Sequence, residues 1–80
     1  MKAKVTITLK PGILDPQGET VRQALRSLDN AKVTNARIGK VIELMIDSSD
    51  KATTMASVKN MCDKLLANPV TEDYHIELSG

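Results

Sequence analysis

The chain has 80 residues and a formal net charge of +1, from 11 Lys and Arg against 10 Asp and Glu, and 41% of its residues are hydrophobic. This length limits it to a single domain, residues 1–80, and a domain this small buries only about 60–65% of the surface that its unfolded chain exposes. The basic residues form no run and Tyr74 is the only aromatic residue, which argues against nucleic acid or an anionic membrane as the main partner.

A cytoplasmic location is the expectation from cysteine usage and hydropathy. Cys62 is the only cysteine, which excludes an internal disulfide and fits a reducing compartment. No stretch approaches the roughly 20 apolar residues of a membrane span. The first ten residues alternate between apolar and polar instead of forming the apolar core of a targeting signal.

The first element is predicted to be a half-buried strand over Lys2–Lys10. Ala3, Val5, Ile7 and Leu9 share one face, and lysines and threonines occupy the other. This period of two, with β-branched residues, is typical of a strand with one face in the core. Pro11 and Gly12 end it.

Asp15 and Pro16 predict the start of the first helix. Aspartate is a good N-cap and proline is tolerated at the first helical position. An apolar stripe follows at helical spacing, made of Val21, Ala24, Leu25 and Leu28. Asp29 and Asn30 are expected to close the helix.

The segment Val33–Asp47 is too long for one ordinary strand and contains Gly39. We read it as two strands, Lys32–Ile38 and Lys40–Asp47, joined tightly at a hairpin glycine with positive φ. One long bent strand is the alternative.

A second helix and a last strand complete the chain. Ser48, Ser49 and Asp50 form a cap cluster, and Asn68-Pro69 stops the helix. The inner stripe of the helix is predicted to contain Met55, Val58, Cys62 and Leu65, widened by Met61 and Leu66. Tyr74, Ile76 and Leu78 then alternate with His75 and Glu77, which predicts a strand.

The predicted order βαββαβ belongs to the α+β class and indicates a ferredoxin-like two-layer sandwich, an antiparallel sheet with two helices on one face. Right-handed crossovers place the first and third strands side by side in the centre. The other face carries Lys4, Thr6 and Thr8, but also Val41 and Met45. This mixed face and the thin core favour a dimer or tetramer.

The sequence carries no constellation that indicates a catalytic, cofactor or metal site. Cys62 lies on the inner stripe of its helix, which is typical of a buried, inert thiol, and His75 is a lone surface histidine. The carboxylates fall on loop edges and outer faces. Neither GxxxxGK[ST] nor GxGxxG occurs. An acylphosphatase-type enzyme would need an Arg in the loop after the first strand, and Pro11–Gly18 has none.

Three motifs together resemble one family. They are LKPGILDPQG from Leu9, RIGKVIEL from Arg37 and MCDKLLANPVTEDYHIEL from Met61. In this order and over nearly the whole chain, they are similar to the PurS subunit of phosphoribosylformylglycinamidine (FGAM) synthase, an enzyme of de novo purine biosynthesis.

The resemblance implies a subunit of a carbon–nitrogen ligase that takes its nitrogen from glutamine. A PurQ-type glutaminase would release ammonia. A PurL-type synthetase would use ATP and Mg²⁺ to convert formylglycinamide ribonucleotide into the amidine. The small subunit would assemble the two and assist ammonia transfer, as a dimer or higher homo-oligomer without catalytic or cofactor residues of its own.

Matching the family motifs residue by residue yields candidate partner contacts rather than catalytic groups. These candidates are Asp15, Gln17, Gly18, Arg37, Gly39 and Lys40. The first three belong to the DPQG element, and the last three to the R-x-GK element, where Arg37 and Lys40 flank a protruding turn and could also meet an anion. The alternative function is a small-molecule-sensing regulatory module of the ACT type, and a stand-alone phosphatase is a third, disfavoured reading.

Overall fold

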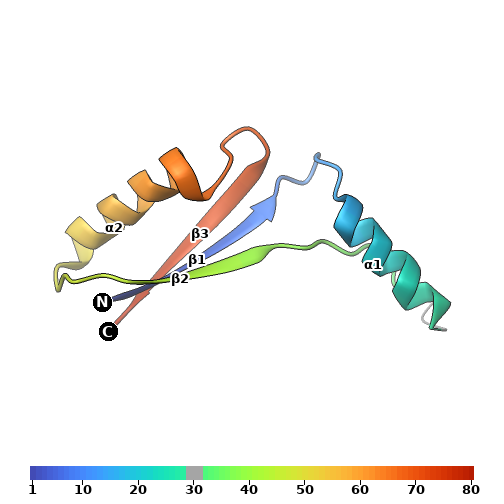
Figure 1. Ribbon diagram of the computed structural model, residues 1–80, viewed down its shortest axis with the longest axis horizontal. Helices are drawn as coiled ribbons and strands as arrows, with labels where there is room; N and C mark the ends of the chain where they lie inside the picture. Colours follow the sequence, from blue (N-terminus) through green and yellow to red (C-terminus); the bar gives the residue numbers. More distant parts are fainter. Residues whose placement is uncertain (29–31) are drawn as a thin grey trace.

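The computed structural model describes residues 1–28 and 32–80 and contains a three-stranded sheet and two helices (Figure 1). The elements are, in chain order, β1 (Lys2–Leu9), α1 (Pro16–Ser27), β2 (Lys40–Met45), α2 (Lys51–Met61), a π-helical turn η1 (Cys62–Leu66) and β3 (Glu72–Ser79). The strand order is β2-β1-β3, with both pairs antiparallel.

The central strand β1 supplies most of the core. Val5 pairs with Ile42 of β2 on one side and with Ile76 of β3 on the other. The alternation predicted from the sequence is confirmed, because Ala3, Val5 and Ile7 are at most 1% exposed. They pack against residues that α2 and the following turn contribute, namely Val58, Cys62 and Ala67.

Helix α2 lies over the sheet, and its beginning and the buried Val58 and Cys62 follow from the sequence. Met61, predicted to widen the inner stripe, is instead 39% exposed, and Thr54, which the sequence did not place there, is buried. Asp50 caps it by accepting a hydrogen bond from the Thr53 amide. The π-helical turn then adds one residue to the repeat, and this rotates the following side chains around the helix axis. Leu65, predicted to face inward, is therefore 83% exposed, and Leu66 packs against the core in its place.

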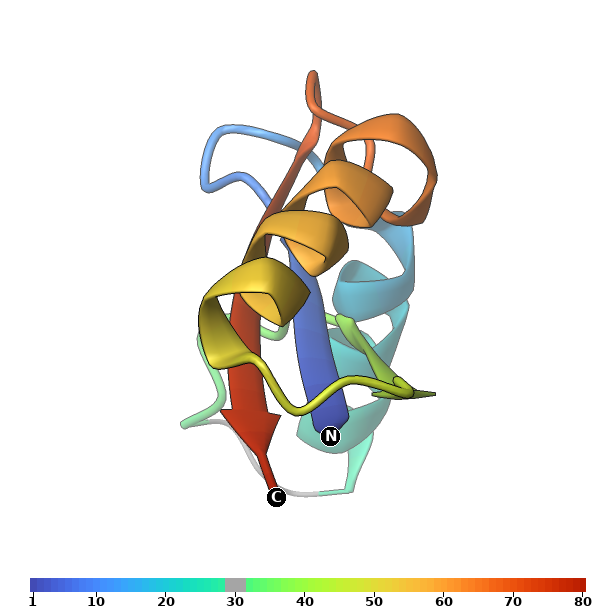
Figure 2. The same ribbon diagram turned by 90° about the vertical axis from the view of Figure 1, so that its left-hand side faces the viewer.

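Helix α1 extends away from the sheet instead of covering it (Figures 1 and 2). Its start is as predicted: Pro16 is the first helical residue and Asp15 is the N-cap. The prediction that both helices lie on one sheet face is wrong for α1, because the chain turns outward after β1. The radius of gyration is 16.1 Å, whereas a compact chain of this length would have about 12 Å.

The segment before β2 also departs from the prediction. Within the part of the chain that the structure describes, Lys32–Ile38 forms no strand, and the order is βαβαβ. All four glycines are described, and of these only Gly80 has a positive φ. Gly39 therefore makes no hairpin, and the chain runs without reversal from residues 33–39 into β2, closer to the alternative of one long segment.

The α+β, ferredoxin-like class is nevertheless confirmed. The first strand pairs with the strand that begins at Lys40, as the right-handed crossover rule predicts. The order β3-β1-β2 is that of the predicted sandwich without its outermost strand, which Lys32–Ile38 would have formed. The predicted helix end at Asp29-Asn30 lies outside the described residues. Among the residues described, no helix is both long and apolar enough to cross a membrane.

Candidate functional site

The candidate contact residues from the sequence gather where α1 begins. The carboxylate of Asp15 accepts two backbone hydrogen bonds: Oδ1 from the Gly18 amide at 2.8 Å, and Oδ2 from the Ile38 amide at 2.7 Å. The first bond caps the helix. The second crosses to the segment that leads into β2, so one buried side chain, 6% exposed, ties together both ends of the α1 excursion.

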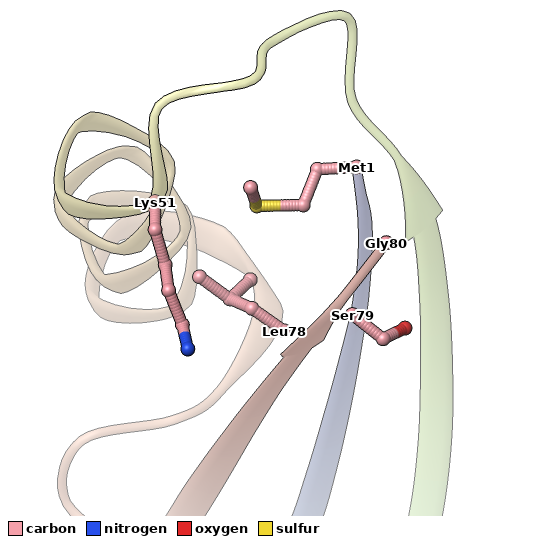
Figure 3. Close-up of a pocket in the computed structure, with 5 residues that line it drawn as sticks. All are labelled: Met1, Lys51, Leu78, Ser79 and Gly80. Carbon is pink, nitrogen blue, oxygen red and sulfur yellow. The ribbon is translucent and has the colours of Figure 1, made fainter.

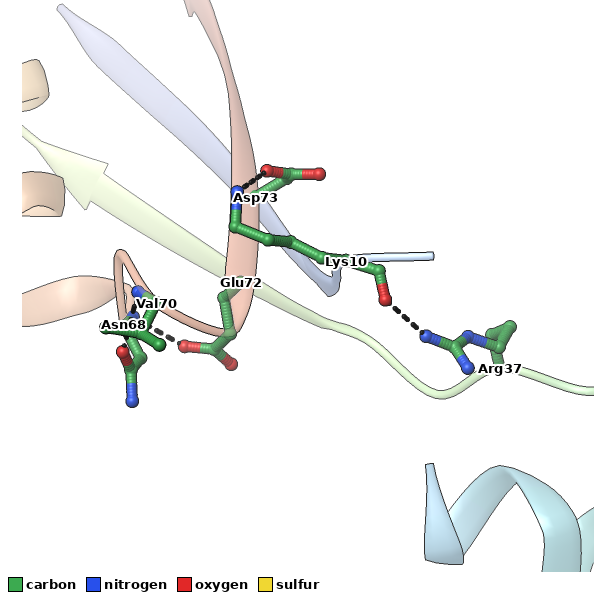
Figure 4. A network of polar contacts seen from close by, with 6 residues as sticks. All are labelled: Lys10, Arg37, Asn68, Val70, Glu72 and Asp73. Carbon is green, nitrogen blue, oxygen red and sulfur yellow. Dashed lines mark hydrogen bonds and ion pairs between the residues drawn. The ribbon is translucent and has the colours of Figure 1, made fainter. Parts of the chain in front are cut away.

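Arg37 makes the reciprocal connection. Its guanidinium donates to the carbonyl oxygens of Lys10 and Ile13, both at 2.9 Å. Figure 4 shows the bond to Lys10 beside the neighbouring polar contacts. The loop after β1, which has no arginine of its own, therefore receives one from a distant segment. We call Asp15, Arg37 and these four hydrogen bonds the Asp15–Arg37 clamp.

Two glycines allow close backbone contacts at the clamp. A Cβ on Gly18 would overlap the carbonyl oxygen of Ala36, so α1 touches the returning segment backbone to backbone. A Cβ on Gly39 would lie 2.7 Å from the Ile7 carbonyl oxygen and 3.0 Å from Thr8 Cγ2. Gly39 is therefore required by close packing against β1 and not by a positive φ.

The other two candidates are open to solvent. Gln17 lies in the first turn of α1 and Lys40 starts β2 opposite Ile7, and both are exposed. The structure thus divides the six candidates into two groups by role. Asp15, Gly18 and Gly39 hold the backbone in place, Arg37 does so from an exposed position, and Gln17 and Lys40 remain accessible to a partner.

The sequence analysis missed a second polar cluster at the same end of the sheet (Figure 4). Lys10 Nζ lies 2.7 Å from the carboxylate of Asp73, and its amide donates to the Thr71 carbonyl at 2.9 Å. Glu72 accepts from the Asn68 amide at 2.7 Å. Nothing in the sequence indicates the contacts of Lys10 with Asp73 and Thr71, because only the pairing of β1 with β3 brings these residues together.

The hydrogen bonds of the clamp also set the ionisation of Asp15. The pKa of its carboxyl is lowered, first by the Ile38 amide, next by the Gly18 amide and then by the charge of Arg37, against the opposing effect of burial. A carboxylate that accepts backbone N–H bonds keeps its charged form. Asp15 is therefore a structural anion and not a proton donor at neutral pH.

Groups that could do chemistry are placed where the sequence predicted. Cys62 is fully buried, and burial raises the pKa of its thiol, as expected of an inert cysteine. His75 is exposed on β3, with Glu77 at 3.6 Å. Among the described residues, no three His, Cys, Asp or Glu side chains come together in a group that could hold a metal ion.

Two hollows mark the surface. One, of about 400 Å³, lies beside the clamp and is lined by Thr8, Leu9, Pro11, Asn35 and Arg37. The other, of about 170 Å³, lies where the chain ends meet α2 and is lined by Met1, Lys51, Leu78, Ser79 and Gly80 (Figure 3). Both are partly open to solvent.

The fold and the clamp define a class of protein. The chain is a small α+β protein with ferredoxin-like strand order, an incompletely covered sheet and one helix held away from it.

Comparison with known proteins identifies the family. The family model PurS, described as phosphoribosylformylglycinamidine (FGAM) synthase, matches residues 2–80. The FGAM synthase subunit PurS of Bacillus subtilis is 49% identical over 77 residues, which cover 96% of this chain and 90% of that protein. The chain therefore belongs to the PurS family of FGAM synthase subunits, as the three motifs suggested.

Solved structures agree with this assignment. Bacillus subtilis PurS superimposes with a TM-score of 0.82 at 50% identity, covering 95% of this chain and 94% of that one. A chain in the structure of PurLQS from Thermotoga maritima gives a TM-score of 0.85 at 33% identity, covering 95% and 93%. Membership of this family favours a synthase subunit over a regulatory module of the ACT type or a phosphatase.

Gly18→Ala tests the backbone contact at the clamp. Alanine is normally favoured in a helix over glycine by about 1 kcal/mol, but here its Cβ would collide with the Ala36 carbonyl. We expect a net loss of about 1–3 kcal/mol in the free energy of unfolding, measured by urea denaturation at matched protein concentration.

Gly12→Ala is the matched control, because a Cβ at Gly12 has no neighbour within 4 Å. Its stability should equal or exceed that of the wild type. A Gly18→Ala variant as stable as Gly12→Ala would contradict the close packing of α1 on the returning segment.

The lowered pKa of Asp15 predicts a pH-dependent contribution to stability. Its ionised form is favoured by folding, so the contribution is complete above the unfolded pKa of about 4 and is lost as pH falls through the lower folded pKa. The stability difference between wild type and Asp15→Asn should therefore shrink on acidification. Denaturation at pH 7 and at pH 3 measures it, and a difference that grows on acidification would contradict this assignment.

Proposed function

We propose that this chain is the non-catalytic small subunit that joins a PurQ-type glutaminase to a PurL-type synthetase in FGAM synthase. The observation that carries the proposal is the family match over residues 2–80. It is supported by the similarity to a chain of PurLQS from Thermotoga maritima, whose name combines the three subunits. The hollow beside the clamp, which is open to solvent, agrees with an assembly role.

In this proposal the chemistry is divided between the partners. The glutaminase releases ammonia and the synthetase binds ATP and Mg²⁺, so this chain requires no cofactor of its own. Its contribution is to hold the two larger subunits so that ammonia passes between them without escaping to water. The complex would work in the cytoplasm, where purine precursors and ATP are available.

The base of α1 is the proposed contact surface for these partners. Gln17 and Lys40 are exposed there, and Arg37 lies beside the hollow of about 400 Å³. Asp15, Gly18 and Gly39 support this surface from below by fixing the backbone. A surface on a rigid frame loses little conformational freedom when a partner binds.

We further propose that the chain self-associates, through two apolar surfaces that do not meet within one copy. Val21 of α1 is 38% exposed, and Leu28, which caps the end of the helix, is 74% exposed. On the face of the sheet that α2 covers incompletely, Ile42 and Leu44 of β2 and Ile46, the residue after it, are only partly buried. Exposed apolar patches on a protein surface often mark a subunit interface.

A second copy fits both surfaces at once. In a two-fold arrangement, each contact occurs twice, so α1 of one copy could cover β2 of the other and the reverse. The extended segment 33–38 lies next to this region and is free of strand pairing in the structure as described. A dimer, or a tetramer built from two dimers, completes the core that one copy leaves open.

The subunit role is tested by reconstitution with the two larger subunits. Omission of this chain should abolish turnover with glutamine, because the glutaminase and synthetase are no longer joined. Turnover with added ammonium salt should persist, since the synthetase active site is intact. Copurification gives an independent readout. Unchanged glutamine-dependent turnover without this chain would refute the proposal.

Leu28→Glu tests self-association. A charge on the apolar stripe of α1 should weaken the dimer at least tenfold, about 1.4 kcal/mol in association free energy, measured by analytical ultracentrifugation. Gln23→Glu, a new charge at an exposed polar position of the same helix, should leave association unchanged. A wild-type chain that sediments as a monomer at micromolar concentration would refute self-association.

A further inference from the structure

The apolar stripe of α1 and the uncovered part of β2 do not pack against each other within one chain, and this arrangement requires a physical cause. The stripe of α1 and the uncovered part of β2 would each gain from burial. In a ferredoxin-like unit, the helix after the first strand normally packs on the sheet of its own chain. In this structure α1 extends beyond the end of the sheet (Figures 1 and 2).

The Asp15–Arg37 clamp supplies such a cause, because it connects the start of α1 to the segment that leads into β2. Asp15 bonds the amides of Gly18 and Ile38 at 2.8 and 2.7 Å. Arg37 holds the loop before the helix through the carbonyls of Lys10 and Ile13. These bonds therefore fix the start of α1 relative to the segment that leads into β2.

Folding α1 back onto its own sheet would require the clamp to break. Gly18 lies against Ala36, and Gly39 lies against Ile7 of β1. Segment 36–39, which leads into β2, is therefore fixed at both ends. A buried carboxylate that lost the Ile38 amide would be left without a full set of partners, which is costly. The bonds of the clamp and the inward motion of α1 thus exclude each other.

We infer that the Asp15–Arg37 clamp is a conformational lock that holds α1 away from the sheet of its own chain. The lock leaves the uncovered part of β2 open, and, resting on the proposed self-association, it makes that surface available to a second copy. Without the lock, one chain could satisfy both surfaces by itself, as in the monomeric counterpart of a domain-swapped dimer.

Two variants remove the lock from opposite sides. Asp15→Asn keeps the size of the side chain, but an NH2 group, which only donates, replaces one of the two oxygens that accept from the Gly18 and Ile38 amides. Arg37→Ala removes the two bonds to the loop after β1 from an exposed position, where folding tolerates truncation better. Glu19→Gln is the matched control, because this carboxylate lies on the same helix and pairs with Arg22 outside the clamp.

The test measures the distance between α1 and α2 within one chain by pulsed electron paramagnetic resonance. Spin labels are placed at Gln23→Cys and Ala56→Cys, both exposed, while Cys62 is buried. Labelled chains are diluted into an excess of unlabelled chains, so only distances within one chain are recorded. Wild type and Glu19→Gln should show a single long distance between the two labels. In both clamp variants, the ratio of chains with a shorter distance to chains with the long distance should rise at least tenfold.

Sedimentation of the same wild-type and variant chains distinguishes a failure of this inference from a failure of the proposed self-association. Clamp variants that remain folded by circular dichroism and keep the single long distance overturn the lock, whatever their oligomeric state. A wild-type chain that is monomeric, but whose variants still shift to the short distance, supports the lock and refutes self-association. If Asp15→Asn does not fold, Arg37→Ala decides the outcome in the same way.

Discussion

The carboxylate of Asp15 joins parts of the chain that are more than twenty residues apart. It caps α1 through the Gly18 amide and holds the Ile38 amide just before β2 begins. Because a buried backbone N–H without a partner is costly, this single side chain sets both where the helix starts and where the returning segment lies. The direction of α1, the close contact that only a glycine at position 18 permits and the open part of the sheet all follow from this arrangement.

The open sheet gives physical meaning to membership of the PurS family. An 80-residue chain has few residues to spare for a core, and this one buries a single face of β1 under α2. Part of the remaining apolar surface lies on α1 and β2, where it stabilises nothing until another surface covers it. Such a chain is incomplete by itself and suited to assembly. This matches a family of small synthase subunits better than a domain built around its own reaction centre.

Local patterns predicted much of the fold because their causes are local. The alternation of β1 follows from the period of a strand, and the caps at Asp15 and Asp50 satisfy amides a few residues away. The errors arose where distant contacts decide. Residues 32–38 have an extended pattern but, in the structure as described, no strand beside them. Gly39 was read as a turn residue, whereas its role is the approach of the backbone to Ile7. Leu65 left the core because a π-helical turn rotated the end of α2.

The candidate site shows the same division between what local patterns indicate and what distant contacts decide. Its six residues were found from motifs, and Asp15 was recognised as a helix cap, but the motifs could not indicate that Asp15 and Arg37 connect the same two segments. By itself, the sequence determined the three observed strands, the helix starts, most of the buried core and the family, because periodicity, capping and motifs are properties of neighbouring residues. Only the tertiary structure decided that α1 stays away from its own sheet, because that outcome depends on hydrogen bonds between segments that are distant along the chain.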